Sequence, residues 1–182
     1  MMITPKEFYS NNLSFCIRSA SEKDAKSLSE VRVQIDGETE NMDREKGEGY
    51  IDEKGFRQII KQDTENWNHL FLVADVDGKV VGFSRCEGSQ LRRSSHKVEF
   101  GVCVLKDYWG HSIGTKLLEE SLLWADANGI KKVALNVLET NEKARILYEK
   151  YGFEVEGVLK KDKLLSDGHY YNTILMGRFN EN

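Results

Sequence analysis

The segment at residues 107–129, DYWGHSIGTKLLEESLLWADANG, constrains the fold of this chain most. An apolar run precedes a turn that holds Gly110, Ser112 and Gly114. After the turn, apolar residues recur at the spacing of one helix face, and Gly129 is placed to end that helix. We therefore expect a strand, a tight turn and a helix. Unpaired amides at a helix start bind anions, and glycines let a ligand approach the backbone closely.

The rest of the chain alternates between strand and helix patterns. Asp77-Gly78 predicts a hairpin between two strands, and residues 166–168 predict another near the end. Ser21 and Asp24 form a variant of the capping box at a helix start. Residues 1–12 are interpreted as a polar leader, and residues 36–49 as a loop. The pattern predicts a mixed α/β fold with strands at 13–20, 69–76, 79–88, 96–106, 131–139 and on both sides of residues 166–168, and with helices at 21–36, 51–66, 113–128 and 141–152.

Length and composition restrict the class of protein. With 182 residues and one proline, the chain is expected to form a single domain over residues 1–182. A net charge of -4 argues against nucleic acid as the main partner. No apolar stretch is long enough for a membrane span, and the N-terminus lacks a signal peptide's apolar region. The three cysteines are interpreted as reduced thiols of a cytoplasmic protein, and the scattered histidines predict no metal site.

The glycine turn has three interpretations from its residues alone. A nucleoside-triphosphate loop has four residues between its glycines and then Lys-Ser/Thr, whereas GHSIGTK has three and the order Thr-Lys. The dinucleotide fingerprint G-x-G-x-x-G is absent. A tight turn without a ligand and a different kind of phosphate site both remain open.

A second segment, NEKARILYEKYGFEVEG at residues 141–157, favours the phosphate site. Together the two segments resemble the GCN5-related N-acetyltransferase (GNAT) superfamily, over about residues 13–179. The resemblance implies a central, mostly antiparallel twisted sheet of about seven strands with about four helices. It also implies acetyl-CoA as the cosubstrate, with the diphosphate on the turn amides. The residues implied in coenzyme binding are Val102, Cys103, Val104, Trp109, Gly110, His111, Ser112, Ile113, Gly114, Thr115, Asn141, Ala144, Leu147 and Tyr148.

This chain departs twice from the family turn R/Q-x-x-G-x-G/A. Trp109 replaces the Arg or Gln, and Ser112 replaces the first glycine of the pair. Because backbone amides bind the phosphates, we expect the turn to function, with weaker coenzyme affinity. Ser112 is a candidate N-cap or a hydroxyl donor to phosphate. The departures also leave a second class open, a catalytically silent acyl-CoA-binding sensor or regulatory module.

The family resemblance implies two catalytic side chains and direct acetyl transfer. Tyr148 is implied as the general acid beside the sulfur; the alternative is a half-buried helix aromatic. Glu99, inside the apolar strand KVEFGVCV, is a candidate general base that we expect to be partly desolvated; the alternative is an outward-facing residue. A backbone N–H near residues 102–104 is expected to polarise the acetyl carbonyl. Cys103 is interpreted as a packing residue rather than a nucleophile.

The acceptor is expected to be a primary amine. Residues 36–65 carry ten acids against five bases, and an acidic wall attracts a cationic amine. The final segment DGHYYNTILMG resembles the last hairpin of family members that acetylate polyamines, amino acids or protein N-termini. The candidate acceptor-binding residues are Glu38, Glu40, Glu99 and Tyr170; a solvated surface is the alternative for the two acids of residues 38–40. A homodimer is a further possibility without a specific residue to support it.

Overall fold

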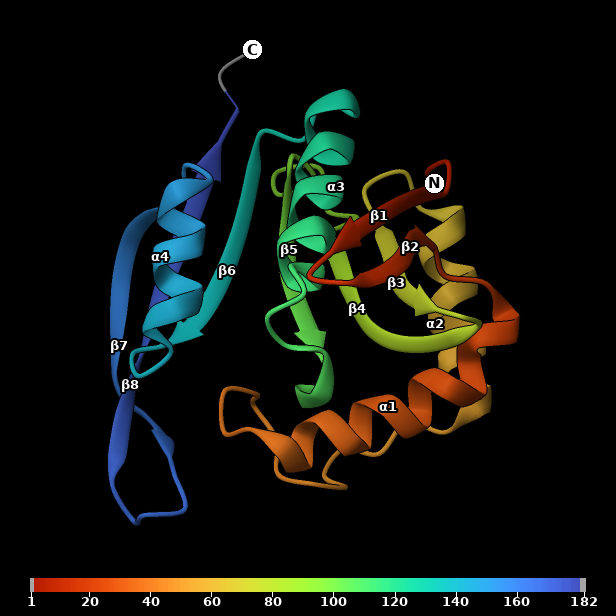
Figure 1. The fold of residues 1–182 in the computed structure, drawn as a ribbon. Helices are drawn as coiled ribbons and strands as arrows, with labels where there is room; N and C mark the ends of the chain where they lie inside the picture. Colours follow the sequence, from red (N-terminus) through yellow and green to blue (C-terminus); the bar gives the residue numbers. More distant parts are fainter. Residues whose placement is uncertain (1, 181–182) are drawn as a thin grey trace.

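The computed structural model describes residues 2–180, which form one mixed sheet with helices on both faces (Figure 1). The strand order is β1-β2-β3-β4-β5-β6-β8-β7. Every neighbouring pair is antiparallel except β5 and β6. The strands are β1 (Lys6–Ser10), β2 (Leu13–Ser19), β3 (Leu70–Val76), β4 (Lys79–Gly88), β5 (Lys97–Val104), β6 (Lys132–Leu138), β7 (Glu154–Leu164) and β8 (Tyr170–Phe179). The α-helices are α1 (Ala25–Glu38), α2 (Glu53–Glu65), α3 (Ile113–Ala127) and α4 (Glu142–Lys150).

The expected mixed, mostly antiparallel sheet is confirmed, with one strand more than predicted. The interpretation of residues 1–12 as a leader is wrong, because β1 pairs with β2 along its whole length. Asn11 and Asn12 make the turn between them, both in the left-handed region. Phe8 supplies most of the hydrophobic contact of β1, by stacking on Phe15 at 5.6 Å between ring centroids. One apolar contact in an edge strand produces too little periodicity to be recognised in the sequence.

Several local signals are confirmed. The capping box is formed by Ser21 and Asp24, at a short 3₁₀ turn just before α1. Asp77 and Gly78 both have positive φ, as a two-residue hairpin turn requires. Gly129 takes a φ of 72° after α3. Among residues 2–180, no helix combines the length and apolar character needed to cross a membrane.

The two faces of the sheet bury separate apolar clusters. Helix α3 packs across β3–β5, where Leu117 and Leu118 are fully buried with Val98 and Phe100. Helices α1 and α2 cover the other face. There, buried residues of both helices meet apolar side chains of β3 and β4, and the cluster consists of Ala20, Ala25, Leu28, Phe56, Ile60, Phe71, Val73 and Val80.

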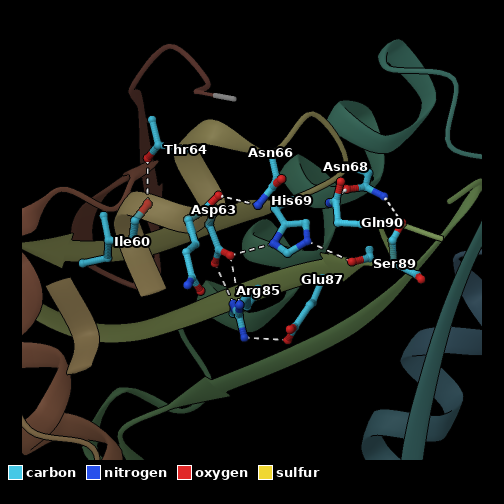
Figure 2. A network of polar contacts seen from close by, with 12 residues as sticks. Ile60, Asp63, Thr64, Asn66, Asn68, His69, Arg85, Glu87, Ser89 and Gln90 are labelled. Carbon is cyan, nitrogen blue, oxygen red and sulfur yellow. Dashed lines mark hydrogen bonds and ion pairs between the residues drawn. The ribbon is translucent and has the colours of Figure 1, made fainter. Parts of the chain in front are cut away.

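A buried polar network fastens α2 to the sheet (Figure 2). The carboxylate of Asp63 accepts hydrogen bonds from Arg85 on β4 and lies 2.7 Å from Nδ1 of His69. The other ring nitrogen of His69 lies 2.9 Å from the carbonyl oxygen of Gly88. Both ring nitrogens of His69 therefore have a polar partner within hydrogen-bond distance.

The parallel pair β5–β6 opens into a wedge, and this feature positions the site. The two strands pair only from Lys97↔Lys132 to Glu99↔Ala134 and then diverge (Figure 1). Beyond residue 99, the edge of β5 that faces β6 has no strand partner. Unpaired backbone amides and carbonyls of this kind can bind an extended ligand as a strand does.

Candidate active site

A cavity of about 580 Å³ lies where the open edge of β5 meets α3 and α4. All the residues implied in coenzyme binding line it, except His111. The structure therefore brings two segments that are distant in the sequence, residues 102–115 and 141–148, to one cavity. Its lining residues are Ile35, Thr39, Asn41, Met42, Val102, Cys103, Val104, Tyr108, Trp109, Gly110, Ser112, Ile113, Gly114, Thr115, Asn141, Lys143, Ala144, Leu147 and Tyr148.

The turn before α3 presents free backbone amides. Gly110 and Ser112 have φ values of 85° and 62°, so the chain reverses sharply. Lys116 N donates to Ser112 O at 2.9 Å, which is the first turn of the helix. The amides from Ile113 to Thr115 precede that bond and have no acceptor within α3. Together with the positive end of the helix dipole, they form a site that suits a phosphate group.

Ser112 occupies the N-cap position of α3, as one interpretation predicted. Its side chain makes no capping hydrogen bond and instead accepts one from Ser10 Oγ at 3.2 Å. The left-handed conformation costs a non-glycine residue about 1 to 3 kcal/mol. The family's glycine at this position avoids that cost, so the departure at Ser112 has a conformational consequence.

Trp109, which replaces the Arg or Gln of the family turn, contacts the backbone of β5. Its indole Nε1 donates to the carbonyl oxygen of Val104 at 2.8 Å, and 48% of the residue remains exposed. The bond fixes the ring at the rim of the cavity. The exposed ring is a flat apolar surface beside the amides of the turn.

The open edge of β5 carries Cys103 on the cavity wall. Burial raises the pKa of its thiol. The raised pKa keeps the sulfur protonated at neutral pH, so it is a poor nucleophile. This agrees with its interpretation as a packing residue.

Tyr148 on α4 points into the cavity from the opposite side of the wedge. The residue is 8% exposed and its ring lies 5.6 Å from that of Phe153. Within residues 2–180, its hydroxyl has no hydrogen-bond partner. Burial raises the pKa of the phenol to about 12. The group therefore holds its proton at neutral pH and can donate it to a ligand atom in the cavity.

Asn141, implied in coenzyme binding by the family resemblance, is both a helix cap and a residue of the cavity wall. It is the N-cap of α4, where its Oδ1 accepts from Ala144 N at 3.4 Å. It also lines the cavity. Within residues 2–180, its side-chain amide nitrogen has no hydrogen-bond partner and is available to a ligand.

Glu99 is not desolvated, so that expectation is wrong. Its side chain is exposed on β5, on the face opposite Val98 and Phe100, and it does not line the cavity. The alternation of the strand turns it away from α3 toward the face of α1 and α2, which do not extend over it. It does lie at the vertex of the wedge, because Glu99↔Ala134 is the last pair of β5 and β6.

The candidate acceptor residues lie outside the cavity wall. Glu38 Oε2 accepts from Lys106 N at 2.7 Å, and Glu40 Oε1 accepts from Ser166 N at 2.8 Å. The bond from Ser166 lowers the pKa of Glu40. Tyr170 is 62% exposed and does not reach the cavity. The carboxylate of Glu38 thus bonds the end of α1 to Lys106, and that of Glu40 bonds the following segment to Ser166.

Sequence reasoning missed six cavity residues. Ile35 and Thr39 come from the end of α1 and its cap, and Asn41 and Met42 follow in the aperiodic segment. No local pattern marks a loop residue as part of a site on a distant strand. Tyr108 and Lys143 were adjacent to the recognised motifs, so their neighbours offered the only signal. The remaining lining residues were named from the sequence.

Comparison with known proteins agrees with this geometry. Residues 37–153 match the acetyltransferase (GNAT) family model. The chain therefore belongs to the GNAT family, whose members transfer the acetyl group of acetyl-CoA. An L-amino acid N-acetyltransferase, AaaT of Escherichia coli strain K12, is 36% identical over 109 residues, which is 59% of this chain and 66% of that protein. The alignments with the curated relatives span between 46% and 66% of their lengths.

Solved structures share the whole architecture. A GNAT-family acetyltransferase from Streptococcus pneumoniae superposes with a TM-score of 0.86 and 27% identity, over 91% of this chain and 98% of the other. The structure of yncA from Salmonella typhimurium with its cofactor acetyl-CoA has a TM-score of 0.81 and 18% identity, over 92% and 95% of the two chains. The donor set described above fits such a cosubstrate: free amides for a diphosphate, an open strand edge for a pantetheine arm and a hydroxyl for a sulfur.

Proposed function

We propose that this protein transfers the acetyl group of acetyl-CoA directly to a primary amine. One observation carries the proposal: a single cavity joins the free amides before α3, the open edge of β5 and the hydroxyl of Tyr148. These three groups suit the three parts of an acyl-CoA, namely its diphosphate, its pantetheine arm and its sulfur. A regulatory module that only binds the coenzyme needs the first two but not a proton donor at the sulfur.

The proposed transfer uses this chain's groups in sequence. Glu99, through water, accepts the proton that the ammonium of the acceptor loses. The amine nitrogen forms a bond to the acetyl carbon while a backbone N–H near residues 102–104 donates to the carbonyl oxygen. The carbon–sulfur bond then breaks, the nitrogen loses its second proton to water, and Tyr148 donates a proton to the departing sulfur. Solvent restores the protonation of both side chains.

The surroundings of Cys103 favour an acceptor that carries a carboxylate beside its amine. Burial is the main cause of the raised pKa of Cys103, Asp36 raises it further, and Arg44 and Arg32 lower it by smaller amounts, so all three charged groups lie near the thiol. Arg44 pairs with Asp36 at 3.1 Å, so this pair is close to neutral. Arg32 donates to the carbonyl oxygen of Gly49 at 2.8 Å and keeps its full charge. Arg32 thus places a cationic group near Cys103, and a cation there suits an acceptor that carries an anionic group.

Among the primary amines that the family resemblance implies, a cation at Arg32 favours a free amino acid. Glu38 and Glu40, which were expected to attract a polycation, are hydrogen-bonded to backbone amides. The similarity to an L-amino acid N-acetyltransferase supports the same choice. The proposed acceptor is therefore an α-amino acid, with its carboxylate near Arg32.

The test is an acceptor panel in which thiol release from acetyl-CoA is measured. The panel contains L-amino acids, their amides, short peptides and spermidine. We expect free amino acids to react fastest and their amides at least tenfold more slowly. Arg32→Gln is expected to raise the KM for amino acids while leaving that for the amides unchanged. Coenzyme binding without thiol release for any amine would instead support the silent binding module.

A further inference from the structure

The β1–β2 turn contacts the glycine turn before α3, although about 100 residues separate them. Asn11 Nδ2 donates a hydrogen bond to the carbonyl oxygen of Gly110. Ser10 Oγ donates to Ser112 Oγ at 3.2 Å. The ring nitrogen Nδ1 of His111 lies 3.4 Å from the carbonyl oxygen of Ser10. Each residue from 110 to 112 thus has a contact to the hairpin.

The hairpin is itself held against α3. Lys6 pairs with Glu120 at 2.7 Å, and Glu120 is only 6% exposed. The ammonium of Lys116 lies 5.5 Å from the ring centroid of Phe8. Both contacts come from β1, and both are to α3, the helix that follows the glycine turn. The hairpin tip and the turn are therefore fixed to the same helix.

The contacts act on a turn that does not hold its shape by itself. Gly110 has access to many backbone conformations, and Ser112 is in a region that non-glycine residues avoid. Ser112 also lacks a capping hydrogen bond of its own. A bond to the carbonyl of Gly110 fixes the peptide plane that contains the N–H of His111, and turns that N–H away from the hairpin.

We propose that Asn11 is a positioning residue for coenzyme binding, with Ser10 in support. The hairpin tip keeps residues 110–112 in the conformation that places the free amides of Ile113 to Thr115 toward the diphosphate of acetyl-CoA, before the coenzyme arrives. The hairpin thereby supplies part of the affinity without a contact to the acetyl group. This inference rests on the proposed use of acetyl-CoA and assigns a role to the one strand that the sequence did not reveal.

The test compares Asn11→Gly with Asn12→Gly. Both residues are in the left-handed region of the same turn, so glycine keeps the backbone of each. Only the side chain of Asn11 reaches the glycine turn; that of Asn12 accepts from the hydroxyl of Tyr9 at 3.1 Å. Coenzyme A binding is measured by calorimetry, and turnover is measured with acetyl-CoA and with S-acetylpantetheine, which lacks the diphosphate.

We expect Asn11→Gly to raise the Kd of coenzyme A and the KM of acetyl-CoA about five- to tenfold, the effect of one hydrogen bond. Its kcat is expected to stay unchanged, as is its kcat/KM with S-acetylpantetheine. Asn12→Gly is expected to match the wild type in every measurement. Ser10→Ala is expected to shift coenzyme affinity in the same direction by a smaller factor.

Three results overturn the inference. The first is an unchanged coenzyme affinity of Asn11→Gly while the wild type binds normally, which leaves the proposed function intact. The second is an equal loss with both acyl donors, because that indicates a general loss of structure. The third is absence of coenzyme binding by the wild type, which overturns the proposed function as well.

Discussion

Asp63 accepts two hydrogen bonds from the guanidinium of Arg85, at 2.6 and 2.9 Å, while only 2% of the carboxylate side chain is exposed. The same carboxylate meets His69 from the other side (Figure 2). One residue of α2 thus contacts both Arg85 of β4 and His69, which directly precedes β3. The position of α2 against β4 therefore depends on the carboxylate of Asp63.

Replacing Asp63 is expected to destabilise the protein strongly. Asp63→Ala leaves Arg85 and His69 partly buried without their partner, which lowers the free energy of unfolding by about 3 to 5 kcal/mol. Urea denaturation of both proteins measures the difference. Glu87→Ala is the control, because Glu87 also pairs with Arg85 but its side chain is 56% exposed; its effect is expected to stay below about 1 kcal/mol. Similar values for the two variants would contradict the role assigned to Asp63.

Removing the hydroxyl of Tyr148 is expected to slow acetyl transfer. Tyr148→Phe keeps the packing against Phe153 but loses the proton donor, and we expect kcat to fall about 10²- to 10⁴-fold with little change in coenzyme affinity. Steady-state kinetics together with calorimetry separate the two effects. Tyr151→Phe, at the C-cap of α4, is the matched control, since the hydroxyl of Tyr151 bonds to Glu119. A Tyr148→Phe enzyme with normal kcat would exclude Tyr148 as the general acid.

The raised pKa of Tyr148 also has a consequence for pH dependence. Burial raises the pKa to about 12, so the phenol keeps its proton well above neutrality. The wild-type kcat is therefore expected to show no decrease due to Tyr148 between pH 7 and 10. An alkaline limb in that window that disappears in Tyr148→Phe would contradict this placement of the phenol.

Glycine at position 112 is expected to stabilise the protein. The φ of 62° costs Ser112 energy that glycine avoids, so Ser112→Gly is predicted to raise the free energy of unfolding by about 1 kcal/mol. Ser112→Ala is the matched control, because it also loses the hydroxyl but keeps the Cβ in the unfavourable region. Thermal and urea unfolding of the two variants isolate the backbone effect. Equal stability of the two would show that residue 112 is not strained.

Glu99 is tested by its pH–rate profile. If it accepts the proton of the acceptor through water, Glu99→Gln lowers turnover and removes the acidic limb of the kcat/KM profile. Glu87→Gln is a well-matched control, because Glu87 is the cross-strand partner of Glu99 and is also exposed. An unchanged profile in Glu99→Gln would reject the base role.

Local signals in the sequence determined most of the elements. The bounds of β4 were predicted to the residue, because Asp77-Gly78 marks its start. The turn before α3 was predicted from its glycines, and the places of Asn141 and Tyr148 in the site were implied by the family resemblance of residues 141–157. These features depend on backbone conformations and caps that act over a few residues. The cavity residues of those two segments followed from the same motifs.

Only the tertiary structure decided how distant segments share the site. The β1–β2 hairpin carries little apolar periodicity, and its contact with residues 110–112 spans about 100 positions. The exposure of Glu99 follows from where α1 and α2 end over the sheet, which the alternation of one strand does not specify. The hydrogen bonds that Glu38 and Glu40 accept from the backbone amides of Lys106 and Ser166 likewise join residues that are distant in the sequence. Such contacts depend on how packed elements meet in space, and no single window of sequence encodes that.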